Sequence, residues 1–369
     1  MAEFAVCTAP LEEEVSGLAE GLKATTLDTT DPASDATPVG REDVAAAMTK
    51  SSLDVEFLVV SDCSFIASVD TPSAALAAKV EEFTFATIER WEAEGLLLIA
   101  DFEGEMMGWG GLLEVAQFLP TTNVDSTLHK TSSSTPADLG LLVDARCDLG
   151  VRVIRRIMES PSLTKLIWGA DADIISLTHH AHLEITCRSV VDVQLAYCDP
   201  SKRLGMAKML QSVVHPQLHL LPRKEKNDTQ YHPQARNCRC CVYPLDAKSA
   251  LYSMDDVHRI DMILNTKTPF SGSYNDAKNT TERYFLTAQN TPDAALAFLN
   301  NELQFYDRKY SMAKSCAAVQ YARGCVAIEL RFASSLTDTQ RAFMVSVRTI
   351  IDEEINRLGL TITSLAWAD

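Results

Sequence analysis

Apolar residues in the middle of the chain form short runs that alternate with longer segments of helical periodicity. The short runs are rich in Val, Leu and Ile, as in VEFLVV (55–60) and LLLIADFEG (96–104), which is typical of buried β-strands. We therefore predict strands at 55–60, 96–104, 111–119, 139–145 and 165–169. Helices are predicted at 71–95, 151–160, 171–181 and 249–265. Strands and helices in this order predict an α/β layered domain.

Local signals mark where some of these elements begin and end. Thr71-Pro72 precedes the first helix and Gly95 follows it, as expected for helix boundaries. A Gly-rich turn with Gly108, Gly110 and Gly111 joins the strands at 96–104 and 111–119. These two strands are therefore neighbours along the chain.

The N-terminal part of the chain has a different composition. Residues 1–50 carry ten acidic residues against three basic ones, and the run at 23–40 has almost no large apolar residues. Such a run buries too little surface to offset its loss of conformational entropy. We predict an acidic, largely disordered segment over 1–50, with a helix at 10–24 where Leu and Val recur at helical spacing.

The layered domain then spans 51–265 and contains an insertion at 202–245. A C-terminal extension occupies 266–369. Its apolar run CVAIELRF (325–332) predicts a strand, and a helix is predicted near 337–358. We therefore expect this extension to be a small α/β unit.

The charge of the chain limits how it could bind nucleic acid. The formal net charge of the 369 residues is −17, and 46% of the residues are hydrophobic. A protein that binds nucleic acid through its overall field is basic, so binding here requires a local basic patch or bound cations. The segment 202–239 has a net charge of +6. It either guides a nucleic-acid backbone or is a solvated loop with incidental charge.

The cysteines and the first residues favour an intracellular location, nuclear or cytoplasmic. Ten cysteines are scattered along a chain that is long enough to fold without disulfides. The start, MAEFAVCTAPLEEEV, lacks the basic and apolar parts of a signal peptide. No uninterrupted apolar run reaches the roughly 18 residues of a membrane span, so no membrane association is expected.

Two acidic side chains follow the apolar run of the strand at 96–104. Asp101 and Glu103 are two residues apart, so on a strand both point to the same face. The alternative is that they are two solvent-facing acids at the end of a strand. Taken alone, the pair favours the second interpretation.

Further acidic residues lie at the boundaries of other core elements. Asp173 stands at the start of a helix after the apolar run KLIWG, although a carboxylate there also favours the helix dipole, a role that suits Asp171 better. Tyr252 and Asp256 are four residues apart and share one face of a helix, unless the Tyr is a core residue and the Asp is exposed. Hydrolysis of a phosphodiester by two metal ions needs several such carboxylates to converge.

The order of these motifs resembles the DEDD superfamily of exonucleases. DFEGE (101–105), SLTKLIWGADADIISL (162–177) and ALYSMDDVHRI (250–260) are similar to the three motifs of that family. The resemblance covers roughly 53–265 and is closest to the tyrosine-bearing subgroup, which includes ribonuclease D, the Rrp-type exosome nucleases and the Egalitarian-like exonucleases. It implies a ribonuclease H-like mixed β-sheet flanked by helices.

The resemblance also implies roles for individual residues. Asp101 would bridge two divalent ions, Mg²⁺ or Mn²⁺, and Glu103 and Asp256 would complete the site of the ion that activates water. Asp173 would support the second ion through water. Tyr252 would hydrogen-bond the attacking water. The implied enzyme is a 3′–5′ exonuclease, a hydrolase of RNA processing whose partners are the 3′ ends of single-stranded RNA or DNA.

The chain departs from the family pattern in its second motif. Trp168, Gly169 and Ala170 occupy the region where many relatives carry a His or Asn before the Asp. These changes leave the four ligand carboxylates in place, which favours an active enzyme, but they bear on how a substrate would fit. The alternative function is a weak or inactive nuclease-like scaffold that binds RNA or a protein partner. The N-terminal segment or the C-terminal extension would then contact the protein partner.

Three other groups of residues have candidate roles. His232, Cys238, Cys240 and Cys241 are potential zinc ligands, but their spacing fits none of the usual CxxC pairs. The histidines at 179, 180 and 182 cluster at the end of a predicted helix, where a charged imidazolium would favour the helix dipole. Trp109 is a core or turn residue, or alternatively stacks on a terminal base.

Overall fold

The structure is a computed structural model. It describes residues 38–51, 54–67, 70–105, 107–121, 139–179, 183–198, 203–212, 244–245, 247–266, 291–310 and 314–357. The chain divides into two compact units, Met1–Pro38 and Val39–Asp369. All the elements below belong to the second unit.

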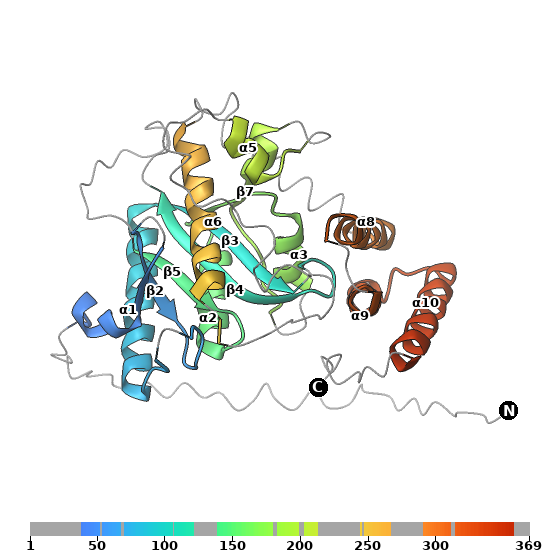
Figure 1. Cartoon of the computed structure of the whole chain (residues 1–369), viewed down its shortest axis with the longest axis horizontal. Helices are drawn as coiled ribbons and strands as arrows, with labels where there is room; N and C mark the ends of the chain where they lie inside the picture. Colours follow the sequence, from blue (N-terminus) through green and yellow to red (C-terminus); the bar gives the residue numbers. More distant parts are fainter. Residues whose placement is uncertain are drawn as a thin grey trace, which may run out of the picture. The chain divides into compact units, whose positions relative to one another are not determined.

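A seven-stranded mixed sheet forms the centre of this unit (Figure 1). In chain order, its strands are β1 (Met48–Lys50), β2 (Glu56–Val60), β3 (Leu97–Glu105), β4 (Leu112–Thr121), β5 (Gly140–Asp144), β6 (Thr164–Ile167) and β7 (Val190–Asp192). Their order in the sheet is β1-β2-β5-β4-β3-β6-β7. β4 is antiparallel to both β3 and β5, whereas β3, β6 and β7 are parallel to one another. The predicted fold class, a mixed β-sheet flanked by helices, is confirmed.

Helices flank this sheet: η1 (Arg41–Ala47), α1 (Ala74–Glu94), α2 (Asp148–Met158), α3 (Asp171–His179), α4 (Val193–Tyr197), α5 (Met206–Ser212) and α6 (Ala247–Thr266). Three further helices, α8 (Pro292–Tyr310), α9 (Lys314–Phe332) and α10 (Asp338–Arg357), pack chiefly on one another. The Ser73 hydroxyl accepts a hydrogen bond from the Leu76 amide at the start of α1. Gly95 ends α1 with a positive φ of 64°, which glycine adopts without strain. The predicted end of this helix at Gly95 is confirmed, whereas its start lies at Ala74, after the predicted Thr71-Pro72.

The alternation of side chains along β3 separates two hydrophobic cores. Leu98 and Ala100 belong to the core that also contains Trp91 of α1, and Leu97 and Ile99 belong to the core that contains Val257 of α6. Figure 1 shows α6 lying across the sheet at β3 and β4, and residue contacts join α6 to both strands. Side chains at odd-numbered positions of β3 therefore face α6.

The C-terminal extension is helical where the structure describes it. Residues 325–332, predicted as a strand, belong to α9 instead. The buried residues of this helix include Ala322, Cys325, Ile328 and Phe332, whose spacing of three to four residues matches a helix face. Burial of that face decides the outcome, so the prediction of an α/β extension is wrong for these residues.

The start of the sheet also differs in detail from the expectation. Residues 41–50, which the composition grouped with the acidic N-terminal segment, form η1 and β1, and β1 pairs with β2. The predicted helix at 10–24 lies outside the described residues. Within the described part of the chain, no helix combines the length and the apolar character needed to cross a membrane.

Candidate metal centre

Three carboxylates from two distant parts of the sequence meet on the α6 side of the sheet. Asp101 and Glu103 come from β3 and Asp256 comes from α6, and one carboxylate oxygen of each lies within 4.8 Å of the others. Asp101 and Asp256 are buried, and Glu103 is partly buried. The shared face that strand alternation predicts for Asp101 and Glu103 is the face that α6 covers.

The local structure of β3 places Asp101 and Glu103 at an irregular end of the sheet. The pairing of β3 with β6 ends at Ile99, opposite Leu166, so Asp101 lies just beyond the last paired position. The register with β4 shifts between Glu103 and Gly104. Such an irregularity bends a strand and redirects the side chains beside it. The two acids therefore occupy the end of the sheet where a pairing stops and a strand bends.

The donor set fits a hard divalent cation. Carboxylate oxygens are the ligands that Mg²⁺ and Mn²⁺ prefer, and the cluster contains no cysteine or histidine that would favour zinc. Three anionic groups this close repel one another unless positive charge is nearby. The cluster of Asp101, Glu103 and Asp256 could therefore hold a metal ion.

Tyr252 lies one helical turn before Asp256 and is buried beside the same cluster. Burial raises the pKa of its phenol first of all, and the charges of Asp256, Glu103 and Asp101 raise it further, whereas Arg259 opposes them. The phenol therefore keeps its proton at any ordinary pH. A neutral O–H next to three carboxylates can donate a hydrogen bond to a bound water or oxygen.

Arg259 is a member of the site that the sequence pattern did not single out. Its guanidinium donates to the Oδ1 atom of Asp256, and both side chains are buried. The guanidinium carbon also lies 6.0 Å from the centroid of the Tyr252 ring. The available sequence signal was the spacing of Asp256 and Arg259, since residues three apart on a helix are neighbours.

Gln117 is a second polar residue at the site that the sequence pattern did not reveal. It stands opposite Asp101 in the antiparallel pair of β3 and β4, so the two side chains share a face of the sheet. The residue is 0% exposed, and neither amide atom has a hydrogen-bond partner among the described residues. Buried amides are normally paired, which makes this one notable beside a candidate metal centre.

Asp173, the fourth predicted ligand, lies outside the cluster of three. It is buried in the first turn of α3. Its charge contributes to raising the pKa of the Cys187 thiol to about 12, although burial is the main cause. The structure thus brings together Asp101, Glu103, Tyr252 and Asp256, but it does not bring Asp173 into the same group of oxygens.

Asp171, the competing acid in the second motif, has other partners. It forms an ion pair with Arg203, and burial raises its pKa against the effect of that arginine. It also helps burial to raise the pKa of Asp192 to about 6. Asp171 therefore belongs to a separate charged group with Asp192 and Arg203.

Trp109 is a core residue, as the first of its two interpretations predicts, whereas the charged role predicted for His179 is wrong. Trp109 is buried and stacks on His179, with ring centroids 4.4 Å apart, so it is not available to stack on a base. It also contacts Phe332 of α9. Burial, with a smaller contribution from Arg331, lowers the pKa of His179 to about 4. The imidazole is therefore neutral at pH 7 and does not interact with the helix dipole as a cation.

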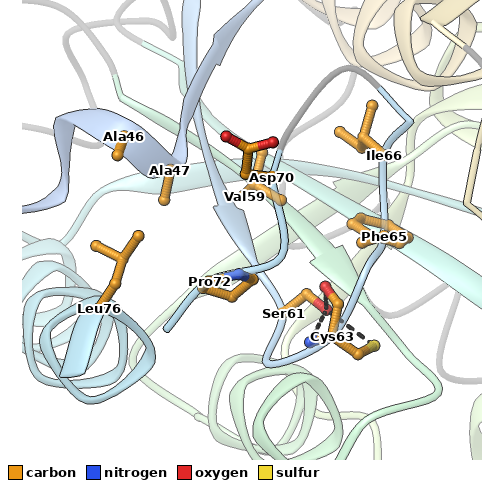
Figure 2. A pocket seen from close by; sticks show the side chains of 10 residues that line it. All are labelled: Ala46, Ala47, Val59, Ser61, Cys63, Phe65, Ile66, Asp70, Pro72 and Leu76. Atoms are coloured by element: carbon orange, nitrogen blue, oxygen red, sulfur yellow. Dashed lines mark hydrogen bonds between the residues drawn. The ribbon is translucent and has the colours of Figure 1, made fainter. Parts of the chain in front are cut away.

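A pocket elsewhere in the structure has a different character (Figure 2). Ser61, Cys63 and Asp70 supply its polar lining, and the remaining lining residues are apolar. Cys63 and Ser61 both donate to Asp144, and burial raises the pKa of the Cys63 thiol. None of the clustered carboxylates lines this pocket, which therefore offers no comparable set of metal ligands.

The potential zinc ligands His232, Cys238, Cys240 and Cys241 lie outside the described residues. Most of the basic segment 202–239 does as well.

Comparisons with known proteins find likeness only among solved structures. No protein-family model matches the chain, and no curated protein does. RNase D of Trypanosoma brucei in complex with GMP is 16% identical with a TM-score of 0.43, and the alignment covers 62% of each chain. The chain thus spans less than two thirds of that structure.

Two further structures are similar. Escherichia coli RNase D is 14% identical with a TM-score of 0.37, over 73% of this chain and 72% of the other. The EXO domain of Aedes aegypti Nibbler is 14% identical with a TM-score of 0.34, over 53% of this chain and 90% of the other. Likeness at this distance does not establish an activity, so the case for the site rests on its own residues.

Proposed function

We propose that the chain is a metal-dependent 3′–5′ exonuclease that hydrolyses the terminal phosphodiester of single-stranded nucleic acid. One observation carries the proposal: Asp101, Glu103 and Asp256 converge within 4.8 Å on one face of the sheet. Such a convergence of buried acids from separate elements is costly unless a cation or another positive group compensates it. Two-metal hydrolysis of phosphodiesters requires this kind of ligand set.

Each residue of the site has its own role in the proposed reaction. Asp101, Glu103 and Asp256 would hold the ion at the cluster, and Asp173 would support a second ion through water. Mg²⁺ or Mn²⁺ held there would supply an activated water and would neutralise charge on the departing oxygen. Tyr252 keeps its proton and donates a hydrogen bond that orients the attacking water.

RNA is the favoured substrate, because the motifs resemble those of nucleases that act on RNA. One of the similar structures, RNase D of Trypanosoma brucei, is a complex with RNA U12. The net charge of −17 opposes binding of a polyanion, so cations at the site and local basic patches such as the segment 202–239 would have to attract it.

A second candidate function is a nuclease-like scaffold that binds RNA or a protein partner without cleaving. Two observations favour it. Arg259 contacts a carboxylate that the exonuclease needs as a ligand, and Asp173 lies outside the cluster. In this case the N-terminal segment or the C-terminal extension would carry the partner contacts.

A cleavage assay separates the two candidates. A 5′-end-labelled single-stranded RNA and the matching DNA are incubated with Mg²⁺ or Mn²⁺, and the exonuclease predicts a ladder of products shortened from the 3′ end. Asp101→Asn keeps the shape of the side chain but removes its charge, and it should abolish shortening. Asp261→Asn, on α6 but bonded to Thr121 instead, is the matched control and should retain activity.

The outcomes are distinct. Metal-dependent shortening that survives in Asp101→Asn would disprove the assigned site. Binding of RNA by the wild-type chain with no shortening under any of these conditions would favour the scaffold.

A further inference from the structure

A buried arginine contacts the candidate metal centre from inside the protein. Asp256 and Arg259 are 1% and 3% exposed at their side chains, and the guanidinium donates to Asp256 Oδ1. They lie three residues apart on α6, so the helix itself holds them together. Because the Arg259 side chain is almost fully buried, it cannot swing out into solvent as a surface arginine can.

The charge of this arginine acts on the whole cluster. Three carboxylates with oxygens within 4.8 Å repel one another, and burial weakens the screening that water would provide. A guanidinium carries a full positive charge, and Arg259 places that charge beside the carboxylates. Arg259 thus offsets part of the repulsion among the three carboxylates, as a bound cation would.

We infer that Arg259 is an internal counter-ion that competes with the metal ion for Asp256 and thereby sets the cation concentration at which the site fills. This inference rests on the proposed metal centre. Arg259 holds one oxygen of Asp256, so a cation meets a ligand that is already partly neutralised. Its positive charge also repels the cation at short range. Both effects weaken metal binding and stabilise the metal-free protein.

The contact with Tyr252 extends the effect to the group beside the water. The guanidinium lies 6.0 Å from the centroid of the Tyr252 ring, close enough for a cation–π interaction. Any shift of Arg259 on metal binding therefore changes the surroundings of this phenol. The metal-free site is held in place by Arg259, Asp256 and Tyr252 together.

Metal binding by charge-changing variants tests the inference. Mn²⁺ affinity is measured on EDTA-treated, full-length protein by the electron paramagnetic resonance signal of free Mn²⁺, independently of any cleavage. Arg259→Gln removes the charge but keeps hydrogen-bond donors, and it should bind Mn²⁺ about tenfold more tightly than wild type. Arg259→Lys keeps the charge and should remain close to wild type.

Arg203→Gln provides a matched control. It removes one positive charge from another ion pair with an aspartate, that with Asp171, and it leaves the cluster intact. It should therefore leave the affinity for Mn²⁺ unchanged. A gain in affinity in both arginine variants would show an effect of net charge alone and would overturn the inference.

Thermal unfolding gives a second readout that does not depend on measuring the concentration of free Mn²⁺. In EDTA, Arg259→Gln should unfold at a lower temperature than wild type, because the cluster has lost its counter-ion. Saturating Mn²⁺ should raise its unfolding temperature by more than it raises that of wild type. Equal shifts in the two proteins would contradict competition.

Failure of the inference differs from failure of the proposed function. If wild type binds Mn²⁺ and Arg259→Gln binds it equally or more weakly, Arg259 is no competitor, although the metal centre stands. If neither protein binds Mn²⁺, the metal centre itself is wrong and the inference falls with it. Binding that appears in Arg259→Gln and disappears when Asp101→Asn is added supports both.

Discussion

Gln117 of β4 stands directly opposite Asp101 of β3, and its fully buried amide has no hydrogen-bond partner within the described part of the chain. An unpaired buried amide costs roughly 1–3 kcal/mol of folding free energy. Because this unpaired amide lies beside the clustered carboxylates, we infer that the site is organised to hold a bound group and not only to stabilise the fold.

We predict that Gln117→Leu stabilises the metal-free protein by about 1 kcal/mol, because the variant removes the unpaired amide at similar volume. Unfolding in urea measures the change. Gln194→Leu is the matched control, since the buried amide of Gln194 donates to the carbonyl of Leu204 at 3.0 Å and its loss should destabilise the protein. A loss of stability in Gln117→Leu equal to that of the control would show that Gln117 has a partner after all.

Tyr252→Phe should slow metal-dependent cleavage by roughly a hundredfold, as expected when a group that orients the attacking water is removed. Mn²⁺ affinity should change little, because the phenol is not among the clustered carboxylates. Single-turnover cleavage and Mn²⁺ binding measure the two effects separately. Tyr197→Phe, on α4, is the control: burial alone raises the pKa of its phenol, with no contribution from the clustered carboxylates, so both quantities should stay unchanged. Full cleavage by Tyr252→Phe would remove the tyrosine from the proposed reaction.

Because of the titration of Asp192, the free energy of unfolding should fall as the pH rises from about 4 to about 6. Burial and Asp171 raise its pKa to about 6 in the folded state, above the value of about 4 for an unfolded chain. Between these values the folded state binds more protons than the unfolded state, so the free energy of unfolding falls with rising pH and levels off above 6.

Asp192→Asn tests this relation, because an amide does not titrate. Urea unfolding at a series of pH values should show that the difference in stability between wild type and variant changes between pH 4 and 6 and is constant above. Asn is also a good N-cap, so α4, which Asp192 caps, should persist. A constant difference across the whole series would mean that Asp192 titrates normally.

Gly110→Ala should destabilise the protein by roughly 2 kcal/mol or more. Gly110 has a φ of +73°, and a Cβ atom there would lie 2.4 Å from backbone atoms of Arg323 and Gly324 in α9. The substitution therefore strains the turn and separates it from α9. Urea unfolding measures the loss.

Gly205→Ala is the matched control for this glycine, since a Cβ atom there meets nothing within 4 Å. It should change stability by less than about 0.5 kcal/mol. Similar small changes in the stability of both variants would indicate that α9 does not pack closely against the turn at Gly110.

The sequence by itself determined the local faces of the candidate site. The alternation of β3 set Asp101 and Glu103 on one side of a strand, and the helical repeat set Tyr252 and Asp256 on one side of α6. Both follow from backbone geometry within a few residues, so they can be derived without knowing the rest of the fold.

The tertiary structure decided which of these faces meet and what else joins them. Asp101 and Asp256 are more than 150 residues apart, and only the packing of α6 across β3 and β4 brings their oxygens within 4.8 Å. The same packing buries Arg259 against Asp256, whereas Asp173 stays outside the cluster. Local periodicity fixes where a side chain points, but long-range burial of apolar faces selects its neighbours, and those neighbours determine its charge environment and its chemistry.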